Sequence, residues 1–207
     1  MGLNIDIIKK FRRTFETRCL ALVIDAYKVA IDNKSIKLDW DENDITAELH
    51  SYIDSDQKRI DWKIITNVEQ HIPKKDIEKE KGFAAKFPRI DMRLTTFSSH
   101  QEYKYHLEAK NLKQNSSKLK RRYIDTGIDS FVSKKYSNGS IIGYLLEGEV
   151  DKTMDGINSL LVKDDRESEI LKTGILTLHP DYYESEHPRI ETLKHIVFDF
   201  TKTVVLK

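Results

Sequence analysis

The chain has 207 residues and one cysteine, and its 35 basic and 34 acidic side chains leave a net charge of +1. A single cysteine excludes a disulfide framework and a cysteine-based zinc site, and no run approaches the ~20 apolar residues of a membrane span. The first residues lack a basic segment followed by an apolar one, so we expect no signal peptide and a cytoplasmic protein. Because the net charge is near zero, attraction to a polyanion must come from local clusters of basic residues.

Two amphipathic helices are predicted ahead of the first strands. Apolar residues at spacings of three and four predict a long opening helix that ends near Asn33. Its apolar face consists of Ile8, Phe11, Phe15, Cys19, Leu22, Ala26 and Val29. A second helix follows residues 41–44, which are rich in helix-capping side chains. Its buried stripe comprises Ile45, Leu49, Tyr52 and Ile53.

The sequence then changes to strand-like patterns. Residues 62–65 are predicted as a first strand, and two alternating stretches follow at residues 89–94 and 103–110. Residues 98–100 lie between these two stretches, which favours an antiparallel hairpin. The densely charged residues 74–81 are predicted as a loop or a solvated helix.

The second half of the chain again mixes helices and strands. A helix is predicted at residues 124–136, an apolar strand at 141–146, and a further helix that Asp151 caps. Two terminal strands are predicted at residues 175–178 and 195–200. This order of elements predicts an α/β fold with a mixed central sheet flanked by helices.

Two carboxylates fall on the two strands of the predicted hairpin. Side chains alternate along a strand, so Glu108 and Lys110 share one face while Leu107 and Ala109 pack into a core. If the strands pair, Asp91 on the first strand comes close enough to Glu108 to share a cation. Such a pair of carboxylates suits Mg²⁺, which takes oxygen ligands and keeps several waters.

The pattern resembles the PD-(D/E)xK nuclease superfamily, on the residues Pro88-Arg89-Ile90-Asp91 and Glu108-Ala109-Lys110. Two residues separate Pro88 from Asp91, whereas the literal motif has none. The resemblance implies a restriction-endonuclease-like core that hydrolyses phosphodiester bonds with Mg²⁺, for which Mn²⁺ can substitute. It implies that Asp91 and Glu108 bind the metal and that Lys110 orients or activates the attacking water; we prefer the orienting role.

Further site residues follow from the same resemblance. The superfamily often supplies an acidic residue from a helix ahead of the core strands, and Glu48 lies on the apolar side of its helix. Glu48 is therefore a candidate third metal ligand, and a buried structural hydrogen bond is an equal alternative. The family commonly continues from the catalytic strand into a helix that approaches DNA. The nucleic-acid-binding candidates here are Lys113, Lys118, Lys120, Arg121 and Arg122.

On this interpretation the chain is one nuclease domain, with a helical element at 1–42, a catalytic core at 43–162 and a strand-rich extension at 163–207. We expect a DNA endonuclease of a bacterial restriction or defence type, acting on DNA rather than RNA, as a homodimer or with a partner subunit. Residues 127–132 and 183–189 also look like segments of uncharacterised bacterial restriction-type proteins.

Plainer interpretations stay open. Glu108 and Lys110 can form a same-face ion pair of little energetic value, with Asp91 a solvent-facing strand residue. The basic run can be a solvated helix face, and His106 is expected at the surface. The spacing of the C-terminal histidines matches no metal-ligand pattern: His179, His187 and His195. The protein can also be a non-cleaving nucleic-acid-binding module, or an assembly subunit whose enzymatic partner is another chain.

Overall fold

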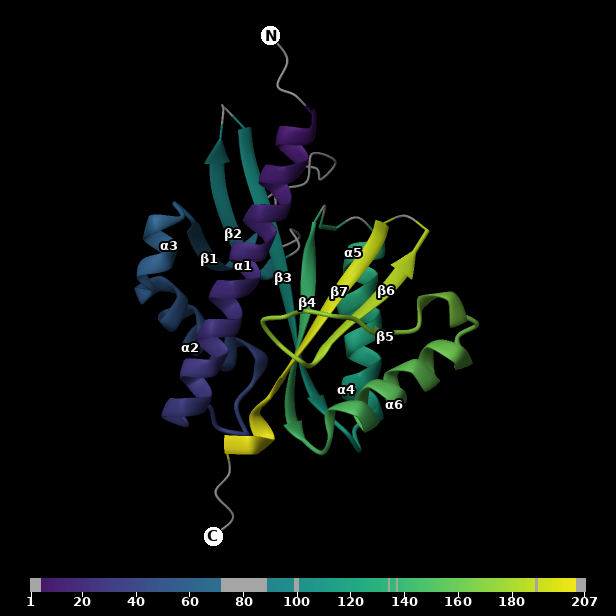
Figure 1. Cartoon of the computed structure of the whole chain (residues 1–207). Coiled ribbons are helices and arrows are strands. Elements are labelled where there is room, and N and C mark those ends of the chain that lie inside the picture. Colours follow the sequence, from purple (N-terminus) through teal and green to yellow (C-terminus); the bar gives the residue numbers. More distant parts are fainter. Residues whose placement is uncertain are drawn as a thin grey trace, which may run out of the picture.

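A computed structural model describes residues 5–71, 89–98, 101–133, 135–136, 138–188 and 190–203. The chain is an α/β protein, in which a seven-stranded mixed sheet lies between two layers of helices (Figure 1). The predicted fold class is therefore confirmed. No described helix is both long enough and apolar enough to cross a membrane.

The two predicted N-terminal helices are present as α1 (Ile5–Asn33) and α2 (Glu42–Ser55). The apolar face of α1 packs on the sheet, but Val29 is 40% exposed and does not belong to it. The stripe continues instead by a step of four residues from Ala26 to the buried Ala30, as the helical period of 3.6 residues allows. A third helix, α3 (Gln57–Asp61), was not predicted from the sequence.

The first three strands form an antiparallel meander: β1 (Ile65–His71), β2 (Arg89–Ser98) and β3 (Gln101–Lys113). The predicted β2–β3 hairpin is thus confirmed. The first strand begins at Ile65 rather than at Trp62, because α3 and the turn that leaves it occupy the preceding residues. The predicted loop or helix at residues 74–81 lies outside the described residues, as does Pro88.

After β3 the chain crosses one face of the sheet through α4 (Ser117–Arg122), the π-helical η2 (Tyr123–Ile128) and α5 (Asp129–Val132). It then enters β4 (Gly139–Glu147), which runs parallel to β3, and α6 (Val150–Lys163). The predicted helix and strand are confirmed, although the helix ends at Val132 and leaves Tyr136 beyond it. Asp151 lies in the first turn of α6 and Glu149 holds the cap position.

The C-terminal part contributes η3 (Glu167–Glu169), β5 (Lys172–Thr173), β6 (Tyr182–His187), β7 (Ile190–Asp199) and η4 (Phe200–Thr203). The strand order is β1-β2-β3-β4-β7-β6-β5, with β7 parallel to β4. The strand predicted at 195–200 lies within β7 except at Phe200, and the strand predicted at 175–178 is wrong. Ile175 is 97% exposed there, so its apolar side chain does not face a core.

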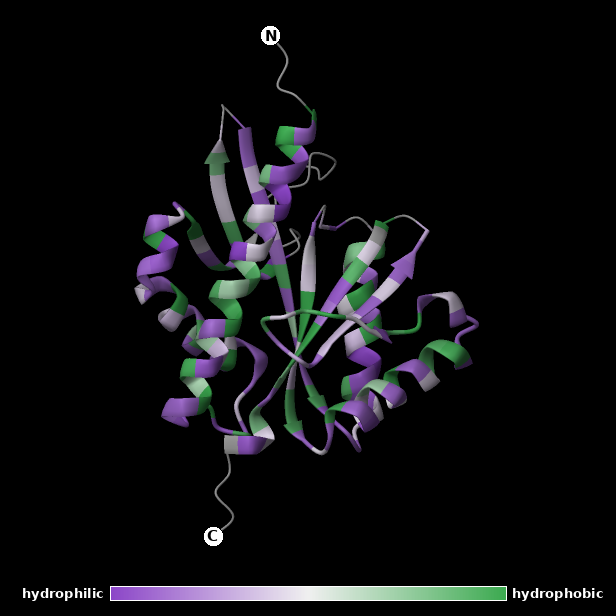
Figure 2. Cartoon of the chain, viewed as in Figure 1, coloured by the Kyte–Doolittle hydropathy of each residue, from purple (hydrophilic) through white to green (hydrophobic). Residues whose placement is uncertain are grey.

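Two hydrophobic cores lie on opposite faces of the sheet. One joins α1 and α2 to β2, β3, β4 and β7, and the other joins η2, α5 and α6 to β4, β6 and β7. β4 lies between both cores, and its interior residues are buried on both faces. Figure 2 accordingly shows a largely hydrophobic β4 and a hydrophobic inner side on α1.

A chain of buried polar side chains crosses the second core from η2 to β6. Tyr123 Oη lies 2.9 Å from His195 Nδ1, and Ser185 Oγ lies 2.7 Å from His195 Nε2 and 2.7 Å from His187 Nε2. His187 Nδ1 lies 2.8 Å from a Glu169 carboxylate oxygen. Burial, followed by the charge of His187, lowers the pKa of His195 to about 3, so this imidazole is neutral at neutral pH.

His195→Gln is expected to make stability less dependent on pH. The folded pKa of about 3 lies below the unfolded value of ~6.5, so the unfolded chain takes up the proton first. In the wild type, the contribution of the neutral His195 ring to the free energy of unfolding is fully present above pH ~6.5. It is lost as the pH falls towards ~3, by roughly 2 kcal/mol at pH ~4.5. Urea unfolding near neutral pH and at pH ~4.5 measures this loss, and an equal loss in the Gln variant would contradict the assignment.

Candidate active site

The two hairpin carboxylates meet where the β2–β3 ladder ends. The last residues paired across the ladder are Met92 and Leu107. Immediately beyond them, the Ala109 N–H donates to Asp91 Oδ2 at 2.6 Å. In a continued ladder, a backbone carbonyl of β2 accepts the hydrogen bond from a β3 N–H group. Here the side-chain oxygen of Asp91 accepts it instead. Asp91 is therefore held against β3, next to Glu108.

The Lys110 ammonium lies among three carboxylates. Its Nζ donates to Glu108 Oε1 at 2.8 Å, and it lies 3.8 Å from Asp91 Oδ2 and 3.6 Å from Glu42 Oε2. Glu108 and Lys110 share one face of the strand, as the alternation predicts. They form the same-face ion pair of the plainer interpretation, and their side chains are each only 6% exposed.

The third carboxylate, Glu42, comes from the first turn of α2. The Asp41 carboxylate accepts the N–H groups of Asn43 and Asp44 and starts the helix there. Glu42 directs one oxygen towards Lys110 and pairs through the other with Arg122 at 2.6 Å. Sequence reasoning missed Glu42. The available signal was its place just after a helix cap, where the helix dipole favours a negative charge.

Glu48 is not part of this cluster. Its carboxylate accepts the Tyr52 hydroxyl at 2.8 Å, one turn along the same helix. Glu48 follows Glu42 by a step of six positions, which is a rotation of roughly 240° about the helix axis. The two carboxylates therefore point in different directions, and α2 brings Glu42 rather than Glu48 to the lysine.

Burial and mutual charge perturb the ionisation of the cluster. Burial, followed by the charge of Glu108, raises the pKa of Asp91 to about 6, although Lys110 and the Ala109 N–H act in the opposite direction. Burial lowers the pKa of Lys110, but the charges of Glu108, Asp91 and Glu42 outweigh it and raise that pKa above its ordinary value. Lys110 is therefore an ammonium at neutral pH.

Tyr136 holds the other side of Glu108. Its buried hydroxyl lies 2.7 Å from Glu108 Oε2 and 2.7 Å from the Arg89 carbonyl oxygen. Lys110 and Tyr136 thus contact different oxygens of one carboxylate and fix its orientation. His106 stacks on the Tyr136 ring, with centroids 5.5 Å apart. The expectation that His106 lies at the surface is wrong, because β4 and the segment before it cover the ring and leave it 6% exposed.

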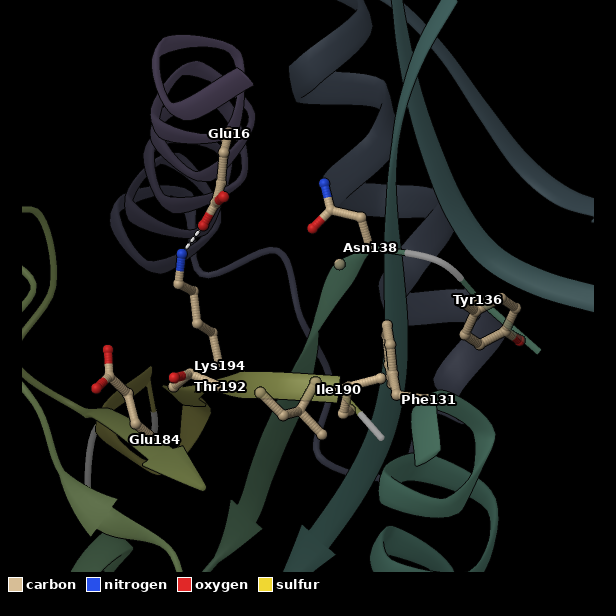
Figure 3. A pocket seen from close by; sticks show the side chains of 10 residues that line it. Glu16, Phe131, Tyr136, Asn138, Glu184, Ile190, Thr192 and Lys194 are labelled. Atoms are coloured by element: carbon tan, nitrogen blue, oxygen red, sulfur yellow. Dashed lines mark ion pairs between the residues drawn. The ribbon is translucent and has the colours of Figure 1, made fainter. Parts of the chain in front are cut away.

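Two cavities border this cluster. The smaller, of about 250 Å³, is lined by Asp91, by the start of α2 and by the end of β1. The larger, of about 520 Å³, includes Tyr136 but none of the carboxylates around Lys110. In Figure 3 the Tyr136 hydroxyl points away from the Glu16–Lys194 ion pair that lies across this larger cavity. Asp91 lines the smaller cavity, whereas none of the three carboxylates lines the larger one.

Carboxylate oxygens are the type of ligand that a divalent cation such as Mg²⁺ takes in proteins. Asp91 and Glu108 both approach one cationic nitrogen, and Glu42 adds a third negative charge. Two protein carboxylates completed by waters are a usual Mg²⁺ environment. Within the described ranges no three His, Cys, Asp or Glu side chains are grouped closely enough to enclose a metal, and here the Lys110 ammonium lies between the carboxylates.

The basic run after β3 is partly engaged within the fold. Lys120 donates to the Gln114 carbonyl, Arg121 pairs with Asp164, and Arg122 pairs with Glu42. The ammonium groups of the two other candidates make no hydrogen bond or ion pair with another described residue: Lys113 and Lys118. Arg122 is thereby joined to the acidic cluster, although Lys118 and Arg122 are themselves exposed.

Asp91→Asn is expected to stabilise the fold at neutral pH by on the order of 2 kcal/mol, allowing for partial exposure. The folded pKa of about 6 exceeds the unfolded value of ~3.9. The contribution of Asp91 to the free energy of unfolding is therefore greatest below pH ~4 and is lost as pH rises through about 6. The amide has no charge to lose and still accepts the Ala109 N–H.

Urea unfolding of both proteins near neutral pH and at pH ~4 tests this, with Asp155→Asn on the exposed side of α6 as the control. The gain should be confined to Asp91→Asn at the higher pH. An equal destabilisation at both pH values would contradict the ionisation described above.

No family model matches the chain, and neither does any curated protein or solved structure. The assignment of a function therefore rests on the geometry of this site and on the chemistry of its residues.

Proposed function

We propose that the chain is a metal-dependent nuclease that hydrolyses phosphodiester bonds, with DNA as its substrate. The observation that carries the proposal is the convergence of Asp91, Glu108 and Lys110 at the end of the β2–β3 ladder. A bound Mg²⁺ or Mn²⁺ would polarise the phosphoryl oxygen and lower the pKa of a coordinated water.

The order of elements supports the resemblance to the PD-(D/E)xK superfamily. A helix with an acidic residue precedes the strands, and two neighbouring antiparallel strands carry the two carboxylates. A helical crossover, an apolar strand and a further helix follow, as α4–α5, β4 and α6. These features support the proposal of a nuclease of this type.

The chain's own residues have distinct roles on this proposal. Asp91 and Glu108 would hold the metal, and Glu42 replaces Glu48 as the candidate third carboxylate because it faces the same ammonium. Lys110, charged at neutral pH, orients the attacking water and stabilises negative charge on the phosphate rather than removing a proton. The Tyr136 hydroxyl keeps the Glu108 carboxylate in position.

The proposal extends to the biological role, the location and the assembly of the protein. A bacterial restriction or defence role, a cytoplasmic location, and a homodimer or partner subunit are consistent with a small nuclease that cuts both strands. The non-cleaving alternative is less favoured by the site. Burial and the charge of Glu108 raise the pKa of Asp91 to about 6, and clusters of ionisable groups with perturbed pKa values are typical of active sites.

Glu108→Ala and Lys110→Ala are each expected to reduce cleavage by more than ~100-fold, because they remove a metal ligand and the charge that orients the nucleophile. Plasmid DNA and single-stranded RNA are incubated with Mg²⁺, with Mn²⁺ and with EDTA. Glu147→Ala, at the exposed end of β4, serves as the control. The proposal fails if folded wild-type protein cuts neither substrate with either metal, or if both site variants cut as fast as the control.

Tyr136→Phe is expected to weaken Mn²⁺ binding by roughly 10–100-fold, since groups that orient a ligand carboxylate typically contribute that much. Calorimetric titration of Mn²⁺ without nucleic acid measures the affinity. Tyr52→Phe is the matched control, because it removes the hydroxyl that contacts Glu48. A loss of affinity in Tyr52→Phe alone would assign the metal to Glu48 and remove Glu108 from the site.

A further inference from the structure

Arg93 lies on the same face of the sheet as the acidic cluster, one row further along the hairpin. It pairs with His106 across β2–β3 and with Asn67 across β1–β2. Directly paired residues point to the same side of a sheet, as do residues two apart on one strand. Because His106 precedes Glu108 by two residues, Arg93 faces the side of the carboxylates, about 7 Å along the strand.

The charge of Arg93 has no counterpart among the described residues. Its side chain is half-buried, its Nε is buried without a hydrogen-bond partner, and no ion pair joins it to a described carboxylate. An unpaired cation in partly desolvated surroundings is unfavourable, so such a group is expected where a ligand brings the anion. The other described half-buried arginines each have a carboxylate or an aromatic ring as partner: Arg18, Arg59, Arg121 and Arg166.

The neighbouring histidine does not compete with Arg93 for an anion. His106 Nδ1 lies 3.0 Å from the Asn138 carbonyl oxygen, and a carbonyl only accepts, so Nδ1 carries the hydrogen. His106 Nε2 is then an acceptor. The side chain of this row that carries a permanent positive charge is therefore Arg93.

We propose that Arg93 binds a backbone phosphate of the nucleic acid next to the metal-binding carboxylates; this inference rests on the proposed nuclease function. A guanidinium offers a planar pair of donors that matches a phosphate bidentately. The spacing of one row places a substrate strand along the β2–β3 hairpin, with one phosphate at the carboxylates and another at Arg93. The sheet face formed by β1, β2 and β3, rather than α4 alone, then contacts the substrate.

Arg93→Met tests the inference, because it keeps an unbranched side chain and removes the charge. Affinity for a short DNA duplex is measured over a range of salt concentrations, in EDTA and again with Ca²⁺. We expect binding to weaken by on the order of tenfold and the salt dependence to become shallower by about one ion. Thermal stability should be unchanged or higher, since an unpaired half-buried cation is removed.

Two matched variants complete the experiment. Arg93→Lys keeps the charge and should retain the wild-type salt dependence, and Arg13→Met, on an exposed part of α1, should leave binding unchanged. If Arg93→Met binds DNA like the wild type while the wild type cuts DNA with Mn²⁺, the inference is wrong and the nuclease proposal stands. A lower melting temperature with an unchanged salt dependence would assign Arg93 a structural role. Wild-type protein that neither binds nor cuts nucleic acid would overturn both.

Discussion

The hydrogen bond from the Ala109 N–H to the Asp91 carboxylate determines the arrangement of the whole site. Because this side chain accepts the bond, regular pairing between β2 and β3 stops at Met92 and the free edge of β3 is left for another element. The start of α2 takes that place, and the segment before it is tied to β3 by the bond from Asn111 Nδ2 to the Trp40 carbonyl at 3.1 Å. Helix α2 packs on one face of the sheet, and its first residue, Glu42, thereby lies next to the carboxylates on the opposite face.

The buried polar groups of the chain fall into two kinds. The chain through Tyr123, His195 and Ser185 satisfies its members with one another, and it joins η2 to the C-terminal strands inside a core. The groups around Asp91 are different, because like charges crowd there and Arg93 has no anion among the described residues. A fold tolerates such groups where a ligand completes them: a cation reduces the repulsion between carboxylates, and a phosphate neutralises the guanidinium. The excess negative charge at the carboxylates and the unpaired positive charge of Arg93 lie next to each other, and for this reason we propose that a metal and a phosphodiester bind there.

Much of this structure follows from local sequence patterns, and the remainder depends on long-range packing. Apolar spacing predicts α1 and α2, and strand alternation with a short connection predicts the hairpin that brings Asp91 and Glu108 together. Glu42 and Tyr136 were not identified, because their roles depend on where α2 meets β3 and on how the chain leaves α5. Local pattern also misleads at residues 175–178, whose apolar character predicts a strand although nothing covers Ile175. Strand β6 was missed because the charged Glu184 and Glu186 alternate with Ser185 and His187, which only tertiary contacts bury.

We propose above all that Asp91 and Glu108 together bind a divalent cation. Crystals soaked in Mn²⁺ and measured near the manganese absorption edge test it without nucleic acid or turnover. If both residues bind the metal, an anomalous peak appears within coordination distance of carboxylate oxygens of Asp91 and Glu108. The Lys110 ammonium then no longer lies between them. Saturating Mn²⁺ that leaves no peak at these carboxylates, with Lys110 still hydrogen-bonded to Glu108, would contradict it.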